Sequence, residues 1–168
     1  MTIYHGSTVA VETPRIIKSH RKLDFGEGFY TTYNQAQAIR WATRVAHRRD
    51  VHTPTITEYD FNLEGAKNAL EIITFDTPDG KWLDFVSANR NAHTPLAPYD
   101  IVIGPVANDI VYTAVLLYEQ GILDKDSAIK QLKVQALYNQ ILFHTPASLA
   151  YCKYIKHYPI GGDSHGAS

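Results

Sequence analysis

The chain has little cysteine and almost no net charge. Cys152 is its one cysteine, which excludes an internal disulfide and a cysteine-rich metal site. The 17 acidic residues nearly balance the 16 lysines and arginines, and the formal net charge is −1. The chain therefore lacks the overall positive field that favours tight, sequence-independent binding of nucleic acid. A local basic patch remains compatible with this charge balance.

The sequence also lacks long apolar runs, a signal-peptide pattern, internal repeats and linker-like segments. A hydrophobic fraction of 45% and a charged fraction of 20% are typical of soluble globular proteins. The 168 residues are enough for one well-packed domain. We therefore expect a cytoplasmic protein with a single domain over residues 1–160 and a flexible, small and polar tail over 161–168.

Strands and helices are predicted to mix without strict alternation, which indicates an α+β fold. Apolar spacing predicts a helix over 35–48 with Asn34 as its N-cap and with Ala38, Trp41, Ala42 and Val45 on one apolar face. The predicted strands are 2–5, 29–32, 55–61, 70–75, 100–103 and 139–145. The other predicted helices are 81–89, 109–120, 125–132 and a last one from Pro146.

The segment "DFGEGFYTT", Asp24–Thr32, combines two glycines with three aromatic rings. Glycines before a strand allow another backbone to approach closely, and a β-bulge beside a core tyrosine would explain the same pattern. The motif is not the dinucleotide-binding fingerprint, because it precedes a strand and does not link a strand to a helix.

Two further segments carry polar groups at strand ends. In "YHGS", His5 offers an imidazole, Gly6 an accessible backbone and Ser7 a hydroxyl, although this tetrapeptide alone favours a strand that ends in a plain Gly-Ser turn. In "NQILFHT", Gln140 stands at the entrance of an apolar strand, where a buried amide must find a partner. That partner is either the local backbone or a bound hydroxyl.

Together these motifs resemble the ADP-ribosyltransferase superfamily, in its diphtheria-toxin and poly(ADP-ribose)-polymerase branch. "YHGS" resembles the histidine element of its first strand, and "FGEGFYTTYNQAQAIRWA" resembles its Gly-x-Gly-aromatic-Tyr element with the following helix. "LYNQILFHT" resembles the late strand of the branch, with Gln140 at the glutamate position. With "YDIVIGPVAND", the set is similar to a bacterial family of uncharacterised, toxin-like transferases.

The resemblance implies two small mixed or antiparallel sheets, flanked by helices, around a cleft that binds NAD as co-substrate. It implies that Tyr30 and Trp41 sandwich the nicotinamide and that the Gly6 backbone binds the carboxamide. His5 and Ser7 would grip the ribose or carboxamide. The implied catalytic residues are His5, Tyr30 and Gln140, and the implied NAD-binding residues are His5, Gly6, Ser7, Phe25, Gly28, Tyr30 and Trp41.

The implied function is mono-ADP-ribosyl transfer to a protein or nucleic-acid acceptor by a toxin of a toxin–antitoxin pair or by an effector, with an antitoxin as a possible partner and without metal or membrane. The alternative is a degenerate module that binds NAD or a partner without turnover. Because Gln140 carries no charge, Asp24, Glu27 and Asp100 are candidates for a nearby carboxylate. The acceptor stays open, and Arg40, Arg44, Arg48 and Arg49 either attract diphosphate or nucleic acid or form a solvated helix face.

Overall fold

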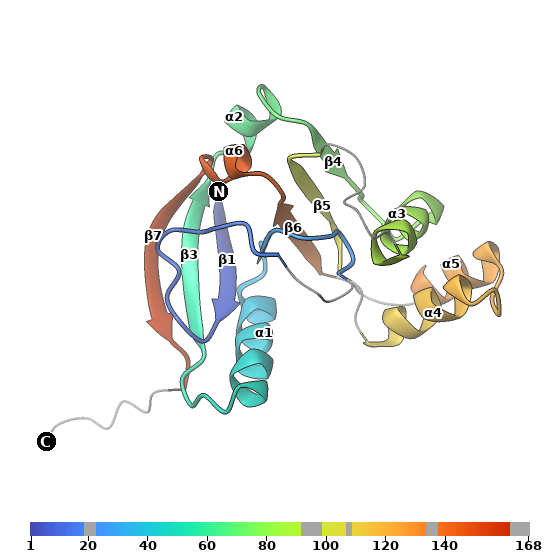
Figure 1. The fold of residues 1–168 in the computed structure, drawn as a ribbon, viewed down its shortest axis with the longest axis horizontal. Coiled ribbons are helices and arrows are strands. Elements are labelled where there is room, and N and C mark those ends of the chain that lie inside the picture. Colours follow the sequence, from blue (N-terminus) through green and yellow to red (C-terminus); the bar gives the residue numbers. More distant parts are fainter. Residues whose placement is uncertain (19–22, 92–98, 107–108, 134–137, 162–168) are drawn as a thin grey trace, which may run out of the picture.

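The computed structural model describes residues 1–18, 23–91, 99–106, 109–133 and 138–161, which form a mixed α+β fold (Figure 1). The strands are β1 (Thr2–Ser7), β2 (Phe29–Thr32), β3 (Thr55–Phe61), β4 (Ile72–Thr74), β5 (Ile101–Pro105), β6 (Asn139–Phe143) and β7 (Cys152–Pro159). The helices are α1 (Gln35–Arg48), α2 (Leu63–Lys67), α3 (Gly80–Asn91), α4 (Asp109–Glu119), α5 (Lys125–Lys133) and α6 (Pro146–Leu149).

The strands form one seven-stranded sheet in the order β4-β5-β6-β2-β1-β3-β7. All neighbours are antiparallel except β4 and β5. The expected division into two separate sheets is therefore wrong, because β2 pairs with β6 on one side and with β1 on the other. Figure 1 shows β7, β3 and β1 on one side of this junction and β6, β5 and β4 on the other.

The junction between β1 and β2 is nevertheless the weakest point of the sheet. β1 pairs with β3 at six positions, whereas it pairs with β2 only at Tyr4 and Thr32. Beyond that pair, the ladder between β1 and β2 is not continued, and the imidazole of His5 bonds to the carbonyl of Tyr30. The sheet is thus continuous in strand order and split locally at the end of β1.

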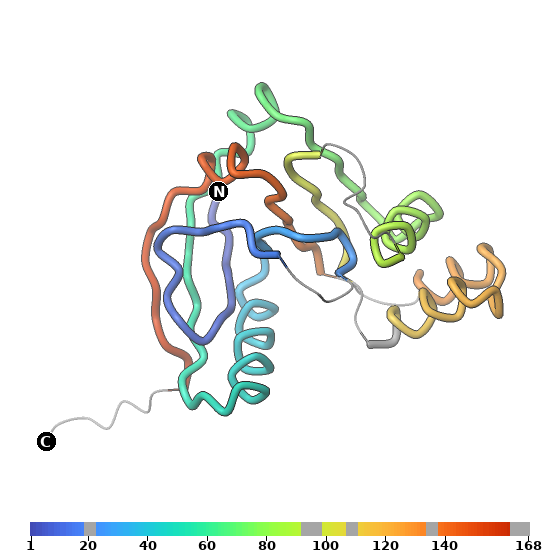
Figure 2. Tube along the Cα trace, viewed as in Figure 1, coloured from blue at the N-terminus to red at the C-terminus, as the bar shows by residue number. Residues whose placement is uncertain are grey.

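One face of the β1–β3 half is covered by the segment after β1, which crosses these strands in Figure 2. The Val11 N–H donates to Thr57 Oγ1 at 3.1 Å, and the Tyr59 hydroxyl donates to the Val11 carbonyl. Beneath this segment lies a core cluster that includes Ile3 and Phe29. The apolar face of the sheet is closed here by a loop, and the short helices α2 and α6 add Ala66 and Leu149 to the same cluster.

Helix α1 begins as predicted, because the Asn34 side chain accepts a hydrogen bond from the Gln37 N–H at the helix N-terminus. Its buried residues are Ala38, Ala42 and Ala46, spaced by four. A methyl group on Gly6 would stand 2.2 Å from the Ala38 carbonyl oxygen, so helix and strand are in backbone contact there. Only small residues allow this approach, and α1 therefore presents alanines to the sheet.

Helices α3, α4 and α5 gather beyond β5 in Figure 1 and share a second core cluster with β5 and β6. Trp82 of α3 is fully buried, and its indole N–H donates to the Pro105 carbonyl at 3.1 Å. β5 runs through Gly104 and Pro105, two residues beyond the predicted strand over 100–103. The ladder with β6, in which Pro105 lies opposite Asn139, holds these residues in the strand.

The C-terminal part differs most from the prediction. The helix that begins at Pro146 ends at Leu149, and Cys152–Pro159 forms β7 in place of a longer helix. β7 pairs with β3 along its length, with Tyr154 and Tyr158 partly buried between exposed neighbours. The expected tail, 161–168, lies outside the described residues apart from Gly161.

Candidate functional site

Three strands bring the quoted motifs together. β6, β2 and β1 are consecutive in the sheet, so "NQILFH", "FYTT" and "TIYH" lie side by side. Thr32 is the central residue, because it lies opposite Tyr4 of β1 and opposite Gln140 of β6. The candidate site is the place where β1 and β2 separate next to this row.

His5 spans the opening between the two strands. Its Nδ1 lies 2.7 Å from the Tyr30 carbonyl oxygen, and its ring stacks on Phe29 with centroids 4.5 Å apart. A carbonyl only accepts, so Nδ1 carries the proton, and in the neutral ring Nε2 is left as an acceptor. Burial lowers the pKa of His5 and outweighs the opposite effect of its bond to Tyr30, which keeps the imidazole neutral.

We expect His5 to make folding stability depend on pH in the acid range. Its pKa is lowered in the folded state, so the unfolded chain binds the proton first as the pH falls below the ordinary value of 6.5. The contribution of the neutral His5 ring to the free energy of unfolding is complete above pH 6.5. It decreases below pH 6.5, by at most about 1.4 kcal/mol per pH unit. Denaturant unfolding of wild type and His5→Asn between pH 7 and pH 5 measures the difference.

Asparagine retains an N–H donor near the position of Nδ1 but does not titrate. The wild type should therefore lose more stability than His5→Asn as the pH falls, while the other histidines contribute equally to both. Parallel curves for the two proteins would contradict the assigned neutral state of His5.

Gln140 is a buried amide with an unused donor. It lies opposite Thr32 on one side and Gly104 on the other, and only 9% of it is exposed. Its Nε2 has no hydrogen-bond partner within the described residues. A buried amide N–H without a partner costs about 1–3 kcal/mol, so this donor is a candidate point of contact for a ligand that offers an acceptor.

His5 and Gln140 approach the split from opposite faces of the sheet. Residues directly opposite each other in antiparallel strands project to the same face, which places Tyr4, Thr32 and Gln140 on the face covered by α1. His5 is one residue further along β1 and projects with Phe29 to the other face. His5 and Gln140 could therefore contact one ligand only in the opening itself, which is bordered by the backbone of Gly6 and Ser7.

Tyr30 and Trp41, the two rings of the expected aromatic clamp, each make other contacts in the structure. The Tyr30 hydroxyl donates to the Gly26 carbonyl at 2.6 Å and accepts from the Phe25 N–H at 3.3 Å. Burial raises the pKa of Tyr30, which keeps the phenol protonated. Trp41 lies on the exposed side of α1, 48% exposed, with the Arg48 guanidinium 5.5 Å from its ring centroid.

The glycine turn is explained by packing against neighbouring elements. Phe25 is 1% exposed in the cluster with α3, so its ring lies in the core and not at a ligand surface. Gly28 has φ +154°, and a side chain there would stand 2.3 Å from the Phe143 carbonyl oxygen. The bare backbone therefore serves the close approach of this segment to β6, and Tyr30 locks the turn.

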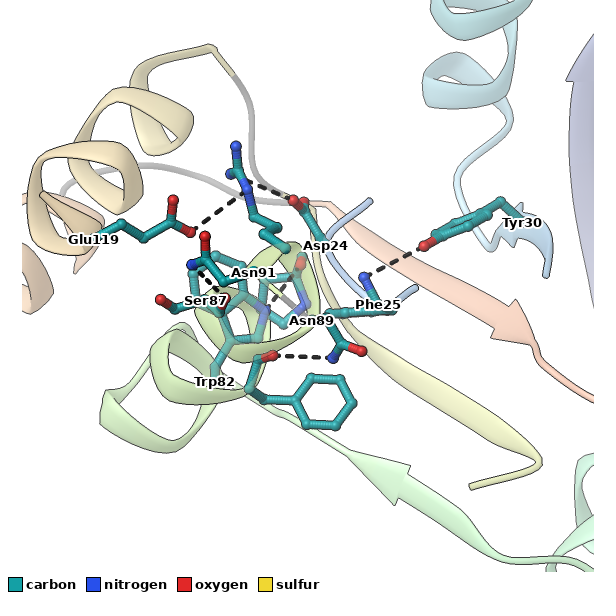
Figure 3. Close-up of polar contacts among 11 residues, drawn as sticks. Asp24, Phe25, Tyr30, Trp82, Ser87, Asn89, Asn91 and Glu119 are labelled. Carbon is teal, nitrogen blue, oxygen red and sulfur yellow. Dashed lines mark hydrogen bonds and ion pairs between the residues drawn. The ribbon is translucent and has the colours of Figure 1, made fainter. Parts of the chain in front are cut away.

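A buried arginine that the sequence did not reveal forms an ion pair with Asp24 of the same turn, and Figure 3 labels Asp24 and Glu119, its two acidic partners. Arg90 of α3 lies 3.8 Å from the Asp24 carboxylate and 3.7 Å from that of Glu119 in α4. Its guanidinium also lies 4.1 Å from the centroid of the Tyr112 ring. An isolated arginine in "SANRN" gives no sequence signal for this role, which depends on the meeting of three distant segments.

The candidate carboxylates do not gather beside Gln140. Asp24 pairs with Arg90, and Asp100 accepts from Thr145 Oγ1 at 2.6 Å and from the Glu71 N–H at 3.0 Å. Asp100 precedes β5, at the far end from Gly104, which faces Gln140. Glu27 is partly exposed and also has an interaction partner.

No group of metal-binding side chains occurs in the described part of the chain, and Ala107 and Asn108 of "YDIVIGPVAND" lie outside it. None of the helices in the described ranges is long and apolar enough to cross a membrane. A hollow lies at the other end of β1 from His5, lined by Met1 and by residues 60–64.

Comparison with known proteins gives a family but no described activity. No curated protein and no solved structure matches the chain. One family model, described as a protein of unknown function (DUF3990), matches residues 1–154. Since this match covers more than half of the chain and all the motifs above, the chain belongs to the DUF3990 family.

Proposed function

We propose that the protein is an NAD-dependent mono-ADP-ribosyltransferase and that NAD binds where β1 and β2 separate. The observation that carries the proposal is Gln140, a buried amide whose Nε2 lacks a partner in the described residues and which lies on β6, separated from β1 by β2. An N–H donor fixed in a water-poor position suits a sugar hydroxyl. The order of the three motif strands supports the same interpretation.

His5 supports the proposal through its hydrogen-bonding state. With its Nδ1–H donated to the Tyr30 carbonyl, Nε2 accepts and can hold a ribose hydroxyl. The ladder between β1 and β2 ends at Tyr4, so no strand pairing occupies the β2 side of Gly6. That backbone edge suits the carboxamide of nicotinamide, which needs both a donor and an acceptor.

The proposed reaction breaks the bond between the nicotinamide nitrogen and C1′ of the ribose. Nicotinamide leaves with the bonding electron pair, and the ribose passes through an oxocarbenium-like state, as in glycoside cleavage. An acceptor nucleophile then forms the new bond to C1′ and gives its proton to solvent. Gln140 orients the ribose hydroxyl but supplies neither charge nor a general base, which favours transfer of a single ADP-ribose over polymer synthesis.

The test is incubation of the purified protein with labelled NAD, with and without bacterial lysate. Release of nicotinamide, with label attached to a macromolecule, would support transferase activity. Separate protease and nuclease digestion of the product then identifies the acceptor. NAD binding without nicotinamide release would favour the alternative, a degenerate binding module, and absence of both would overturn the proposal.

A toxin role predicts growth arrest. Expression of the wild type in a bacterium without a neutralising partner should stop growth, and His5→Ala should restore it because alanine cannot hold the ribose hydroxyl. His5→Asn keeps an N–H donor to the Tyr30 carbonyl, so the contact between β1 and β2 is retained. This variant therefore separates a loss of catalysis from a loss of that contact. Normal growth with abundant soluble wild-type protein would contradict the toxin role.

A further inference from the structure

The exposed face of α1 is positive and carries no acidic residue. The helix contains three arginines, Arg40, Arg44 and Arg48, and Arg49 follows directly. Spaced by four, the three stand about 6 Å apart along the helix axis. All four side chains are exposed, and no ion pair joins any of them to a carboxylate within the described ranges. Their positive field is therefore not neutralised locally.

Two exposed aromatic rings lie within this row. Trp41 is 48% exposed with Arg48 beside its ring, and Tyr138 is 45% exposed with the Arg40 guanidinium 4.8 Å from its centroid. Each arginine–ring contact is weakly stabilising at an exposed site, and about half of each ring stays open to a further flat partner. Arginines and open rings are also the two elements that single-stranded nucleic acid requires, a charged track for phosphates and flat surfaces for unstacked bases.

The arginine–aromatic face, defined as Arg40, Trp41, Arg44, Arg48 and Tyr138, adjoins the candidate site. Tyr138 directly precedes β6, and its carbonyl accepts from the Val106 N–H at the end of β5. Gln140 follows two residues later in the same strand. A chain bound along this face would pass beside the strand end that carries the unpartnered amide.

We propose that the arginine–aromatic face binds single-stranded nucleic acid, and that this strand is the acceptor class of the reaction. The acceptor role rests on the proposed function, whereas the binding does not. Duplex is disfavoured because its bases are stacked and unavailable to Trp41 and Tyr138. An acidic protein would satisfy the arginines but would leave the two rings without flat partners.

Fluorescence anisotropy with a short labelled oligothymidylate and a matching oligouridylate tests the binding at several salt concentrations. The expected result is binding that weakens with salt. Arg44→Glu/Arg48→Glu should abolish it at moderate salt, and Trp41→Ala should weaken it about tenfold. Arg44→Gln/Arg48→Gln should lower the slope of log affinity against log salt by about 1.4, because each phosphate that is no longer neutralised lowers it by about 0.7.

The matched control is Lys130→Glu/Lys133→Glu, which reverses two exposed charges in the last turns of α5 and should leave the affinity unchanged. Equal weakening in both charge-reversed variants, or tighter binding of a hairpin duplex or of polyglutamate, would overturn the proposal. Nicotinamide release without NAD-derived label on the oligonucleotide would overturn the acceptor role alone. Oligonucleotide binding without nicotinamide release would support the surface and reject the proposed transferase.

Discussion

Replacing Gln140 with alanine is expected to slow nicotinamide release by about two to three decades while NAD affinity changes much less. The amide is buried on β6, and its Nε2 lacks a partner within the described residues. A bond from this group to a ribose hydroxyl fixes the sugar in the geometry of the reaction, so its loss affects the transition state more than the binding of NAD. Removal of one preorganised hydrogen bond of this kind costs about 2.7–4 kcal/mol in the transition state.

Asn139→Ala is the matched control, because Asn139 is the preceding residue of the same strand and its exposed side chain projects to the other face. Gln140→Glu tests charge separately and should raise hydrolysis of NAD relative to transfer, since a carboxylate can also activate water. Nicotinamide release is measured with and without acceptor, and calorimetry gives the NAD affinity. Equal release by wild type and Gln140→Ala would make Gln140 a structural residue.

Replacing Gly6 with alanine is expected to destabilise the fold by about 3 kcal/mol, near the upper end of what overpacking costs. The added methyl group would stand 2.2 Å from the Ala38 carbonyl oxygen and 3.0 Å from the Ala42 nitrogen. Both atoms belong to the backbone of α1, so no side chain can rotate away and the helix itself must move. Denaturant unfolding at constant pH measures the decrease in stability.

Gly80→Ala is the control for this substitution. At Gly80 the nearest atom to an added methyl group is the Cε of Lys125, at 2.9 Å, which belongs to a flexible side chain and can move. Its effect should therefore be close to zero. If Gly6→Ala is no more destabilising than Gly80→Ala, the backbone contact between β1 and α1 is not tight, and the split has room on the α1 face.

Local signals in the sequence were enough for most of the elements. Alternation and turn residues predicted β2 and β3 at their observed bounds, and Asn34 set the start of α1. The strand order around Thr32 also agrees with the motif comparison. The strand bounds and the start of α1 depend on residues close together in the chain, so a short local pattern specifies them, whereas the strand order joins segments far apart.

The direction of Trp41 could not be found in this way. One helix offers two overlapping stripes that could face the core, one formed by positions 38, 41, 42 and 45 and the other by positions 38, 42 and 46. The large tryptophan side chain favoured the first stripe as the buried one. The opposite choice follows from Gly6, which brings the backbones of β1 and α1 so close that only alanines fit between them. The same limitation concealed β7, whose residues become a strand because the edge of β3 is available for pairing.

The sequence by itself determined the mixed α+β composition, the motif strands and the candidate residues His5 and Gln140. Only the tertiary structure decided that the halves of the sheet join at Tyr4 and Thr32, and that His5 and Gln140 project to opposite faces. It also decided that Arg90 is buried against Asp24 and Glu119. These outcomes depend on strand register and on contacts between distant segments, which the pattern of one short segment does not contain.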